Sequence, residues 1–300
     1  MAKPLEGFYR KLPIIRELRL LYNEISRLYN TINHINERLQ WMMKIQQDAF
    51  QQNLMSQQRY RDPKRLSLYE HQVHSQNGED GIIAEIFRRI GTADKTFLEV
   101  GVGDGLENNT AYLLTQGWTG CWVECDPRGV RAIRDNLGRR LSDGTLKLIE
   151  LFVNMENVAP ALKAGAVPED LDLLSIDVDR NTYWIWSALA HIRARVVVVE
   201  YNAAFPASVD WKVDYDPRAQ WDGSFDYGAS LKAFELLGRR LGYCLVGCDL
   251  TGTNAFFVRQ ELCQGAFCEP FDSETHYELL RGWLWGAGRV AHRRGYGDLT

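Results

Sequence analysis

The stretch Phe97-Leu98-Glu99-Val100-Gly101-Val102-Gly103-Asp104-Gly105 decides the fold of this chain. An apolar run with an acid near its end is followed by three glycines at alternate positions. This pattern predicts a strand that runs into a tight turn ahead of a helix. Glycines at such a turn let a ligand approach the backbone N–H groups at the helix N-terminus. A turn that needs glycine only for packing is the alternative interpretation.

A second acidic residue stands where a βαβ nucleotide site would place one. The apolar run Gly120-Cys121-Trp122-Val123-Glu124 predicts a second strand, and Glu124 follows Gly105 by about nineteen residues. In such sites an acid at this spacing accepts hydrogen bonds from the ribose hydroxyls of the cofactor. The turn and the acid together predict a nucleotide-type cofactor at the carboxyl ends of these strands.

Length and composition are those of an ordinary globular protein. The chain has 300 residues and a formal net charge of -4, which allows one or two domains with a sizeable core. Its slightly acidic balance lacks the basic footprint of a nucleic-acid-binding protein, and no apolar stretch has the length of a membrane span. The first residues lack the apolar core of a signal peptide, and the six cysteines form no CxxC pair. We therefore expect reduced cysteines and a cytoplasmic protein.

The first sixty residues carry a heptad pattern. Apolar residues recur in alternating steps of four and three, at Ile14, Leu18, Leu21, Ile25, Leu28, Ile32, Ile35, Leu39 and Met42. A seam this narrow is typical of a coiled coil, whereas a helix that lies on its own domain usually carries a wider apolar stripe. We expect self-association through this helix. Ile25 and Ile32 favour a dimer, and the reversed order at Ile35 and Leu39 leaves a trimer open.

From Leu66 onward, strand and helix patterns alternate, which predicts an α/β fold. The expected strands are 96–100, 120–124, 146–153, 171–177, 196–200, 243–247 and 255–258, and the expected helices are 82–90, 128–137, 183–191 and 228–241. The last two strands are too close for a crossover helix, so any pairing between them must be an antiparallel hairpin. We expect a coiled-coil helix over 1–62, a main domain over 63–262 and a C-terminal extension over 263–300.

The glycine turn, the acid after the second strand and the closing hairpin together resemble class I S-adenosylmethionine-dependent methyltransferases, over about residues 73–259. Three segments resemble more narrowly the FkbM-type sugar methyltransferases, a bacterial group often associated with surface polysaccharides: His74-Ser75-Gln76-Asn77-Gly78-Glu79-Asp80, Ser175-Ile176-Asp177-Val178-Asp179 and Val199-Glu200-Tyr201-Asn202. The resemblance implies a Rossmann-like class I methyltransferase fold with a closing antiparallel hairpin, preceded by a long coiled-coil helix. It also implies O-methyl transfer to a hydroxyl of a sugar or surface polysaccharide.

The resemblance further implies a site for the methyl donor, S-adenosylmethionine. Glu99 would contact the donor's amino group, Glu124 its ribose and Asn154 its adenine edge, and the three turn glycines would adjoin its methionine part. The segment before the first helix of the domain would fold over the donor or the acceptor entry, or would simply cap that helix through Asn77 and Asp80. The implied donor-binding residues are Gln76, Glu99, Gly101, Gly103, Gly105, Glu124, Asn154 and Asp177.

Four oxygen-bearing side chains, Asp177, Asp179, Glu200 and Asn202, follow the fourth and fifth expected strands. Ligands of open α/β sheets bind at this edge, and hard oxygen atoms could hold one Mg²⁺ ion there. Asp177, Glu200 and Asn202 are the candidate metal ligands, although hydrogen bonds to donor and backbone without a metal explain them equally simply. A base must take the proton of an acceptor hydroxyl. Asp179, His74 and Asp177 are the candidates for this catalytic role.

Two departures from the related sequences bear on activity. After Asp179 the chain reads Arg180-Asn181-Thr182, where those sequences usually have Gly-Asn-Asp. The loss of a turn glycine and of a carboxylate supports an alternative function, in which a donor-binding or degenerate domain serves as a scaffold and its coiled coil organises an assembly.

Two further segments have open roles. The aromatic-rich stretch 202–230 predicts a lid over a sugar acceptor or, alternatively, a hydrophobic cluster on the edge of the sheet. The tail after Glu269, with its tryptophans and the run His292-Arg293-Arg294, could cover the site or contact a partner.

Overall fold

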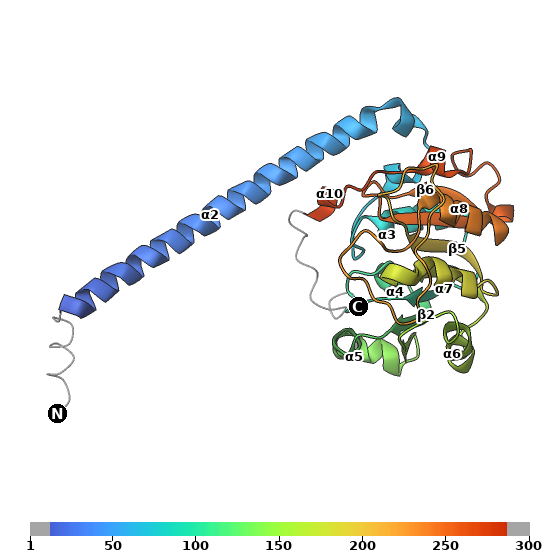
Figure 1. Ribbon diagram of the computed structural model, residues 1–300, viewed down its shortest axis with the longest axis horizontal. Helices are drawn as coiled ribbons and strands as arrows, with labels where there is room; N and C mark the ends of the chain where they lie inside the picture. Colours follow the sequence, from blue (N-terminus) through green and yellow to red (C-terminus); the bar gives the residue numbers. More distant parts are fainter. Residues whose placement is uncertain (1–12, 287–300) are drawn as a thin grey trace. The chain divides into compact units, whose positions relative to one another are not determined.

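The computed structural model describes residues 13–286 (Figure 1). The chain divides into two compact units, Met1–Asn53 and Leu54–Thr300, each described here within those limits. The described part of the first unit is one continuous helix, α2, which spans Pro13–Ser56 and so ends within the second unit. The short helix η1, Gln58–Arg61, follows it. The helix therefore ends before the segment Arg61-Asp62-Pro63, in which the proline disfavours a continuing helix.

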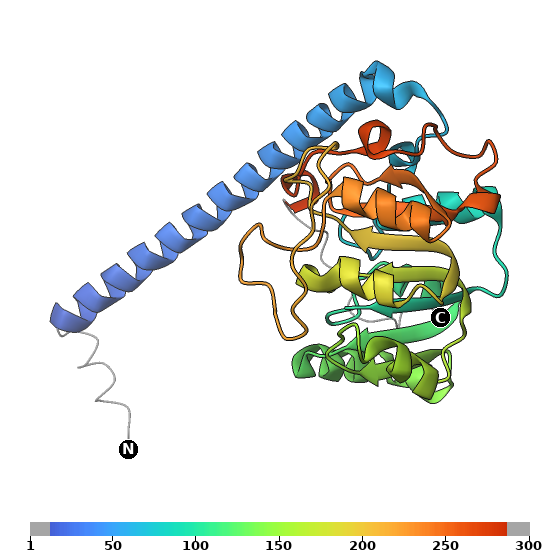
Figure 2. The ribbon, with the colours of Figure 1, turned by 45° about the vertical axis from the view of Figure 1, so that its right-hand side comes forward.

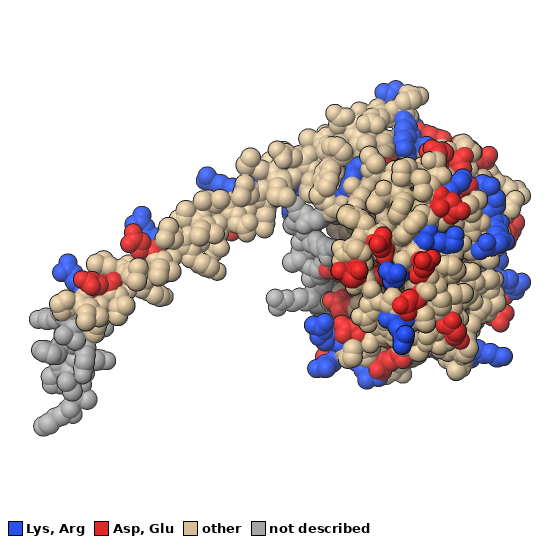
Figure 3. Space-filling view, viewed as in Figure 1, with Lys and Arg blue, Asp and Glu red and all other residues tan. Residues whose placement is uncertain are grey.

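The heptad seam of α2 is exposed along its whole length. Its nine apolar residues are between 52% and 70% exposed: Ile14, Leu18, Leu21, Ile25, Leu28, Ile32, Ile35, Leu39 and Met42. Figure 3 shows that the visible face of this helix carries few charged side chains, whereas Lys and Arg interleave with Asp and Glu over the second unit. Within the described part of the first unit, no side chain covers the seam.

The second unit is built on a seven-stranded sheet with the order β3-β2-β1-β4-β5-β7-β6. The first five strands along the chain pair in parallel, and β7 is antiparallel to both β5 and β6. This is a Rossmann-like arrangement, with an antiparallel pair at one edge. The strands span Thr96–Val100 (β1), Thr119–Glu124 (β2), Leu146–Glu150 (β3), Asp170–Ile176 (β4), Arg193–Glu200 (β5), Tyr243–Cys248 (β6) and Asn254–Arg259 (β7).

Helices cover both faces of this sheet (Figure 2). One face packs against α6, α7 and α8, and the other against α3, α4 and α5. These helices span Glu79–Ile90 (α3), Ala111–Thr115 (α4), Pro127–Ser142 (α5), Val158–Ala164 (α6), Thr182–Ala188 (α7) and Leu231–Arg240 (α8). The run Val196–Val199 of β5 is fully buried, as is typical of a parallel strand that is covered on both faces.

The seven expected strands are present, with bounds that shift by at most three residues. The four expected helices are present too, but the pattern missed α4 and α6. These helices have five and seven residues, so neither completes more than two turns of an apolar repeat. The expected helix 183–191 ends already at Ala188, and the expected strand 146–153 ends at Glu150.

Residues 263–286 pack on the second unit. Phe267 is fully buried in the cluster that includes Ile86 and Phe87 of α3. The remaining short helices are η2 (Leu66–Tyr69), η3 (Asp179–Asn181), η4 (Gln260–Leu262), α9 (Ser273–His276) and α10 (Trp283–Gly286). Residues 287–300 of the expected C-terminal extension lie outside the described residues, as do residues 1–12 of the expected N-terminal helix. None of the helices within 13–286 has the length and apolarity that crossing a membrane requires.

Candidate active site

A cavity of about 700 Å³ lies at the carboxyl ends of the parallel strands, a volume typical of small-molecule sites. Eight acidic residues line it: Glu79, Glu99, Asp104, Glu107, Glu124, Asp177, Asp179 and Glu200. None of its lining residues within the described chain is Lys, Arg or His. An enclosed space with one sign of charge concentrates the opposite sign, so this cavity favours cations and disfavours anions.

The three turn glycines have different reasons to be glycine. All three have positive φ, but a side chain at Gly101 would also meet the Asp177 carbonyl oxygen at 1.7 Å, and one at Gly105 would meet the Trp122 ring at 2.6 Å. At Gly103 a side chain would meet nothing within 4 Å. Gly101 and Gly103 line the cavity and Gly105 does not. Packing therefore explains two of the glycines, and Gly103 is the one whose backbone a ligand can approach.

The Glu99 carboxylate already has its full set of hydrogen-bond donors. Its Oε1 accepts from the Asn109 backbone N–H (2.9 Å) and the Ser175 hydroxyl (3.1 Å). Its Oε2 accepts from Asn108 Nδ2 and from both the N–H and the hydroxyl of Thr110. The residue is 1% exposed, and burial raises its pKa. Glu99 thus fixes the loop after the glycine turn, and the expected contact with the donor's amino group would require it to release one of these partners.

Glu124 is occupied in the same way. Its Oε2 accepts from the backbone N–H groups of Val102 (3.0 Å) and Gly103 (2.7 Å), and its Oε1 from those of Cys125 and Asp126, both at 2.7 Å. The carboxylate therefore joins the glycine turn to the start of α5. Its position on the cavity wall agrees with the expected ribose contact, but a ribose would have to replace some of these N–H donors.

In the segment at the start of α3, one acidic residue holds the preceding loop in place and another lines the cavity. Asp80 Oδ2 accepts from the backbone N–H groups of residues 73–75, at 2.6–2.9 Å. Glu79 accepts from Asn77 and from Asn254 Nδ2 of β7 (2.7 Å), and lies with Gln76 on the cavity wall. The predicted cap by Asn77 and Asp80 is wrong, because Gly78 is the N-cap residue without a side-chain hydrogen bond and Asp80, inside α3, holds the preceding loop.

Besides Gly105, three residues with expected functional roles do not line the cavity. His74 is buried, its Nδ1 lies 3.3 Å from the Leu106 carbonyl oxygen, and its placement gives no access to an acceptor. Asn154 accepts from the backbone N–H groups of Glu156 and Asn157, a local turn rather than an adenine contact. Asn202 is fully buried, and its amide serves nearby backbone groups. The structure thus places His74, Asn154 and Asn202 away from the cavity wall, and their expected roles as base, adenine contact and metal ligand remain predictions.

Asp177, Asp179 and Glu200 form a cluster that we call the acidic trio, in which one oxygen atom of each lies within 4.8 Å of the others. Strand register creates it: Ile176 of β4 pairs with Val199 of β5, so the next residues, Asp177 and Glu200, are neighbours. The pairing of Glu200 with Asn254 extends this polar row to β7. Asp179, with φ of 51°, follows in the turn after β4.

The carboxylates of the acidic trio accept fewer hydrogen bonds from the surrounding protein than those of Glu99 and Glu124 do. Burial, then the charges of Asp179 and Glu99, raise the pKa of Asp177 to about 7. Burial and the charges of Asp177 and Asp179 raise the pKa of Glu200 well above its usual value. Burial and the charge of Glu124 raise the pKa of Asp179. At neutral pH this cluster shares protons because no cationic side chain neutralises it.

The two departures in the Arg180-Asn181-Thr182 turn have structural roles. The Thr182 hydroxyl accepts the Val178 N–H (3.2 Å), and Thr182 does not line the cavity. Arg180 donates from Nη1 to the Asp226 carbonyl (3.1 Å), and its own carbonyl accepts from Gly228. Arg180 thus braces the loop 216–228, which places Trp221, 52% exposed, on the cavity wall. Residues 219–221 of the aromatic-rich stretch 202–230 thus line the cavity, and its role as an acceptor lid remains a prediction.

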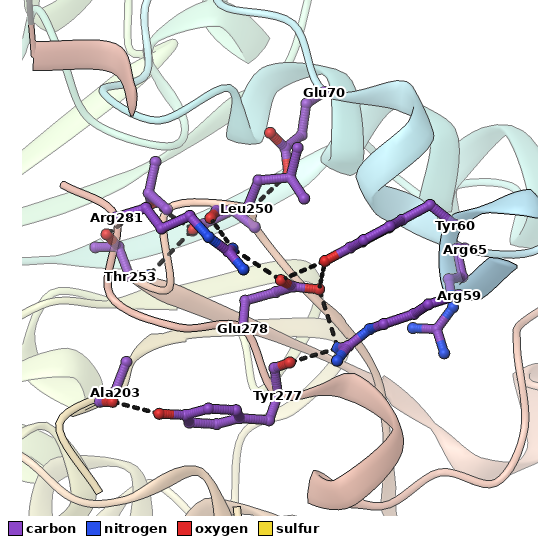
Figure 4. A network of polar contacts seen from close by, with 12 residues as sticks. Arg59, Tyr60, Arg65, Glu70, Ala203, Leu250, Thr253, Tyr277, Glu278 and Arg281 are labelled. Carbon is purple, nitrogen blue, oxygen red and sulfur yellow. Dashed lines mark hydrogen bonds and ion pairs between the residues drawn. The ribbon is translucent and has the colours of Figure 1, made fainter. Parts of the chain in front are cut away.

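Figure 4 shows a buried polar network beside the turn between β6 and β7. Thr253 in this turn and Asn254 at the start of β7 line the cavity. Glu278, 3% exposed, accepts from Arg59 (3.0 Å), from the Tyr60 hydroxyl (2.8 Å) and from Arg281 (2.9 Å). Arg281 also donates to the Leu250 carbonyl in the β6–β7 turn. The segment after α9 is therefore tied to the turn that precedes Asn254.

Several residues that line the cavity were not predicted from the sequence as site residues. They include Asp104, Glu107, Asn108 and Asn109 after the glycine turn, Asn181 after Asp179, and Asn254 at the start of β7. The dense polar run 104–109 behind a strand was a usable signal. For Asn254 there was none, because its place depends on β7 lying between β5 and β6.

No family model and no curated protein matches this sequence. Similar solved structures include the precorrin-6y C5,15-methyltransferase of Geobacter metallireducens (18% identity, TM-score 0.30, 40% of this chain and 61% of that one). They also include a putative caffeoyl-CoA O-methyltransferase of Staphylococcus aureus (14%, 0.39, 59% and 81%). A third is the glycopeptide N-methyltransferase MtfA with S-adenosylmethionine (13%, 0.37, 66% and 99%). At such identities and TM-scores these similarities assign no activity, so the chemistry of this chain has to be derived from its cavity.

Proposed function

We propose that this protein is an S-adenosylmethionine-dependent methyltransferase that acts on a hydroxyl of a sugar or surface polysaccharide. One observation carries the proposal: the cavity at the strand ends combines a glycine turn with eight carboxylates and, among its described lining residues, no basic side chain. The donor is a sulfonium cation, and an acidic cavity attracts it. The pyrophosphate of a nicotinamide cofactor would instead meet only like charge there.

The sheet topology separates a donor half of the cavity from an acceptor half. Chain order reverses between β1 and β4, and ligands of open α/β sheets bind across such a switch point. Gly103 and Glu124 lie on the β1–β2 side, where the donor's methionine and ribose would bind. The acidic trio lies on the β4–β5 side, next to the position of the transferred methyl group.

Methyl transfer from such a donor is an in-line displacement. The acceptor oxygen attacks the methyl carbon while the carbon–sulfur bond breaks, and the bonding electrons stay on sulfur as a neutral thioether. Alignment of the three atoms supplies much of the rate. Asp179 takes the hydroxyl proton, since its raised pKa makes it a stronger base than an ordinary aspartate and no backbone donor occupies it in the described chain.

The acidic trio also offers three oxygen ligands at a spacing that fits one divalent cation. A Mg²⁺ ion held there would polarise the acceptor hydroxyl. The ligands would then be Asp177, Asp179 and Glu200, with Asp179 in place of the Asn202 that the sequence indicated.

The proposal is tested by following radiolabelled methyl transfer from S-adenosylmethionine to a panel of saccharides. Asp179→Asn should keep donor affinity and lower transfer by about a hundredfold or more, the usual scale for losing a general base. Wild type and variant are each assayed with and without EDTA, so that a metal requirement shows as loss on chelation and recovery with added Mg²⁺. Tight donor binding without transfer to any saccharide would favour the scaffold alternative.

We also propose that the chain self-associates through α2, as a dimer or trimer. Nine exposed apolar residues at heptad spacing support this proposal. Light scattering of the full chain should give at least twice the 34.5 kDa chain mass. Ile25→Asp combined with Ile32→Asp should yield monomers, whereas Asn23→Asp with Asn30→Asp, which adds the same charge on the outer face of the helix, should not. A monomeric wild type at micromolar concentration would contradict this.

A further inference from the structure

The acceptor half of the cavity carries more negative charge than methyl transfer to a neutral hydroxyl requires. One base suffices to take the proton, yet Asp177 and Glu200 stand beside Asp179 within 4.8 Å. The acidic trio has no salt bridge among the described residues, although the same unit pairs many of its other acids, including the buried Glu235 and Glu278. Like charges this close repel one another, and Asp177 and Asp179 are exposed, so a cationic ligand can reach and neutralise them.

A buried acceptor atom beside the trio is also without a partner. Asn181 is 4% exposed and lines the same cavity, and its Nδ2 donates to the Asp216 carbonyl at 2.9 Å. Its Oδ1 is buried and accepts no hydrogen bond in the described structure. A buried amide oxygen without a donor is unusual, because the lost hydrogen bond destabilises the fold. Within the described structure, the acidic trio therefore lacks a cationic partner, and Asn181 Oδ1 lacks a hydrogen-bond donor.

The surroundings favour an organic cation over a metal ion. Two aromatic side chains, Phe152 and Trp221, line the cavity, and aromatic faces attract ammonium groups. Asn202, which would add a further oxygen ligand for a metal, is committed to backbone groups.

We propose that the methyl acceptor carries a protonated amine, bound by Asp177, Glu200 and Asn181, next to the hydroxyl that is methylated. The compactness of the trio requires the two groups to be neighbours, as in an amino sugar or another vicinal amino alcohol. An ammonium group donates three hydrogen bonds, which matches these three acceptors. Asp179 remains free to take the proton of the adjacent hydroxyl. Acidic saccharides and phosphorylated acceptors are disfavoured for the same reason. This inference rests on the proposed function and narrows its acceptor class.

The test compares three probes that differ at one position: methyl glucosaminide, its N-acetyl derivative and methyl glucoside. Each is titrated into the full-length protein saturated with S-adenosylhomocysteine, at pH 7, with EDTA and in a buffer free of amines. The glucosaminide should bind about tenfold more tightly than either neutral probe, the scale of one or two charge-assisted hydrogen bonds. Glu200→Gln should remove this preference while keeping the affinity for S-adenosylhomocysteine.

Two further variants keep the test decisive. Asp104→Asn removes one carboxylate from the donor half of the same cavity and should retain the preference. Asp177→Asn replaces Glu200→Gln if the latter fails to fold. Equal binding of the three probes, or a preference that survives in the Glu200 and Asp177 variants, would overturn the inference. So would Mg²⁺ binding to the trio without any amine preference. Binding of S-adenosylhomocysteine without an amine preference overturns this inference alone, whereas its absence overturns the proposed donor site and this inference with it.

Discussion

The carboxylates on the two halves of the cavity differ in how their hydrogen-bonding capacity is used. Glu99 and Glu124, on the β1–β2 side, accept five and four hydrogen bonds from the loops around them. The acidic trio accepts few, and burial together with the charges of neighbouring carboxylates raises the pKa of each of its members. A carboxylate whose oxygen atoms all accept hydrogen bonds from the protein (a filled carboxylate) stabilises the fold. A carboxylate with free acceptor capacity (an unfilled carboxylate) is available to a ligand. Position on the cavity wall alone does not tell the two apart.

The largest difference should appear in stability. Glu99→Ala leaves five donors without their acceptor in a buried site, so we expect a loss of about 3 kcal/mol or more in the free energy of unfolding. Urea denaturation of the full chain at pH 7 measures it. Asp177→Asn is the matched control and should lose none. If both variants were equally stable, the distinction between filled and unfilled carboxylates would fail.

Glu124 should show a smaller loss of stability together with a loss of donor binding. Glu124→Gln replaces two of the four accepting positions by an N–H₂ group that faces backbone N–H donors, and we expect about 2 kcal/mol of destabilisation. Calorimetric titration at 10 °C, where the variant stays folded, should show weaker binding of S-adenosylhomocysteine. Normal donor affinity in this variant would mean that Glu124 only supports the turn.

Removing a carboxylate from the acidic trio should raise the free energy of unfolding, in contrast to the losses expected at Glu99 and Glu124, and only at higher pH. Folding raises the pKa of Asp177 to about 7, so the folded state holds a proton that the unfolded chain releases near pH 4. This contribution to stability is present below pH 4 and is lost as the pH rises towards 7. Asp177→Asn lacks the penalty, and should gain about 1 kcal/mol relative to wild type between pH 5 and pH 8. Thermal unfolding of both proteins at the two pH values checks this, and a parallel pH dependence would contradict it.

The sheet could be predicted from the sequence because each strand is marked by a short run of neighbouring residues. The apolar runs that end in Glu99, Glu124 and Glu200 mark strands by themselves, and the fixed spacing of parallel strand ends brings their acids to one edge. It could not show which acids are filled, because the donors come from elsewhere: Ser175 reaches Glu99 from β4, and Asn254 reaches Glu79 from β7.

The same limit applies to three predicted site residues that do not line the cavity. The side chains of His74, Asn154 and Asn202 each lie against a backbone group instead. Such local hydrogen bonds compete with ligand contacts for the same atoms, and residue type alone does not show which wins. Asn181 has the same residue type and one unpartnered oxygen, a difference that only the tertiary structure reveals.

The central claim is that this cavity selects for positive charge through the unfilled carboxylates on its acceptor side. Titration of S-adenosylmethionine, S-adenosylhomocysteine and NAD at pH 6 and pH 8 tests it most directly, because the first two differ by the sulfonium charge and its methyl group. We expect both sulfur compounds to bind and NAD not to bind. The affinity for S-adenosylmethionine relative to S-adenosylhomocysteine should rise several-fold from pH 6 to pH 8, as Asp177, with a pKa of about 7, loses its proton. A ratio that does not change with pH, or binding of NAD in place of S-adenosylhomocysteine, would contradict the account.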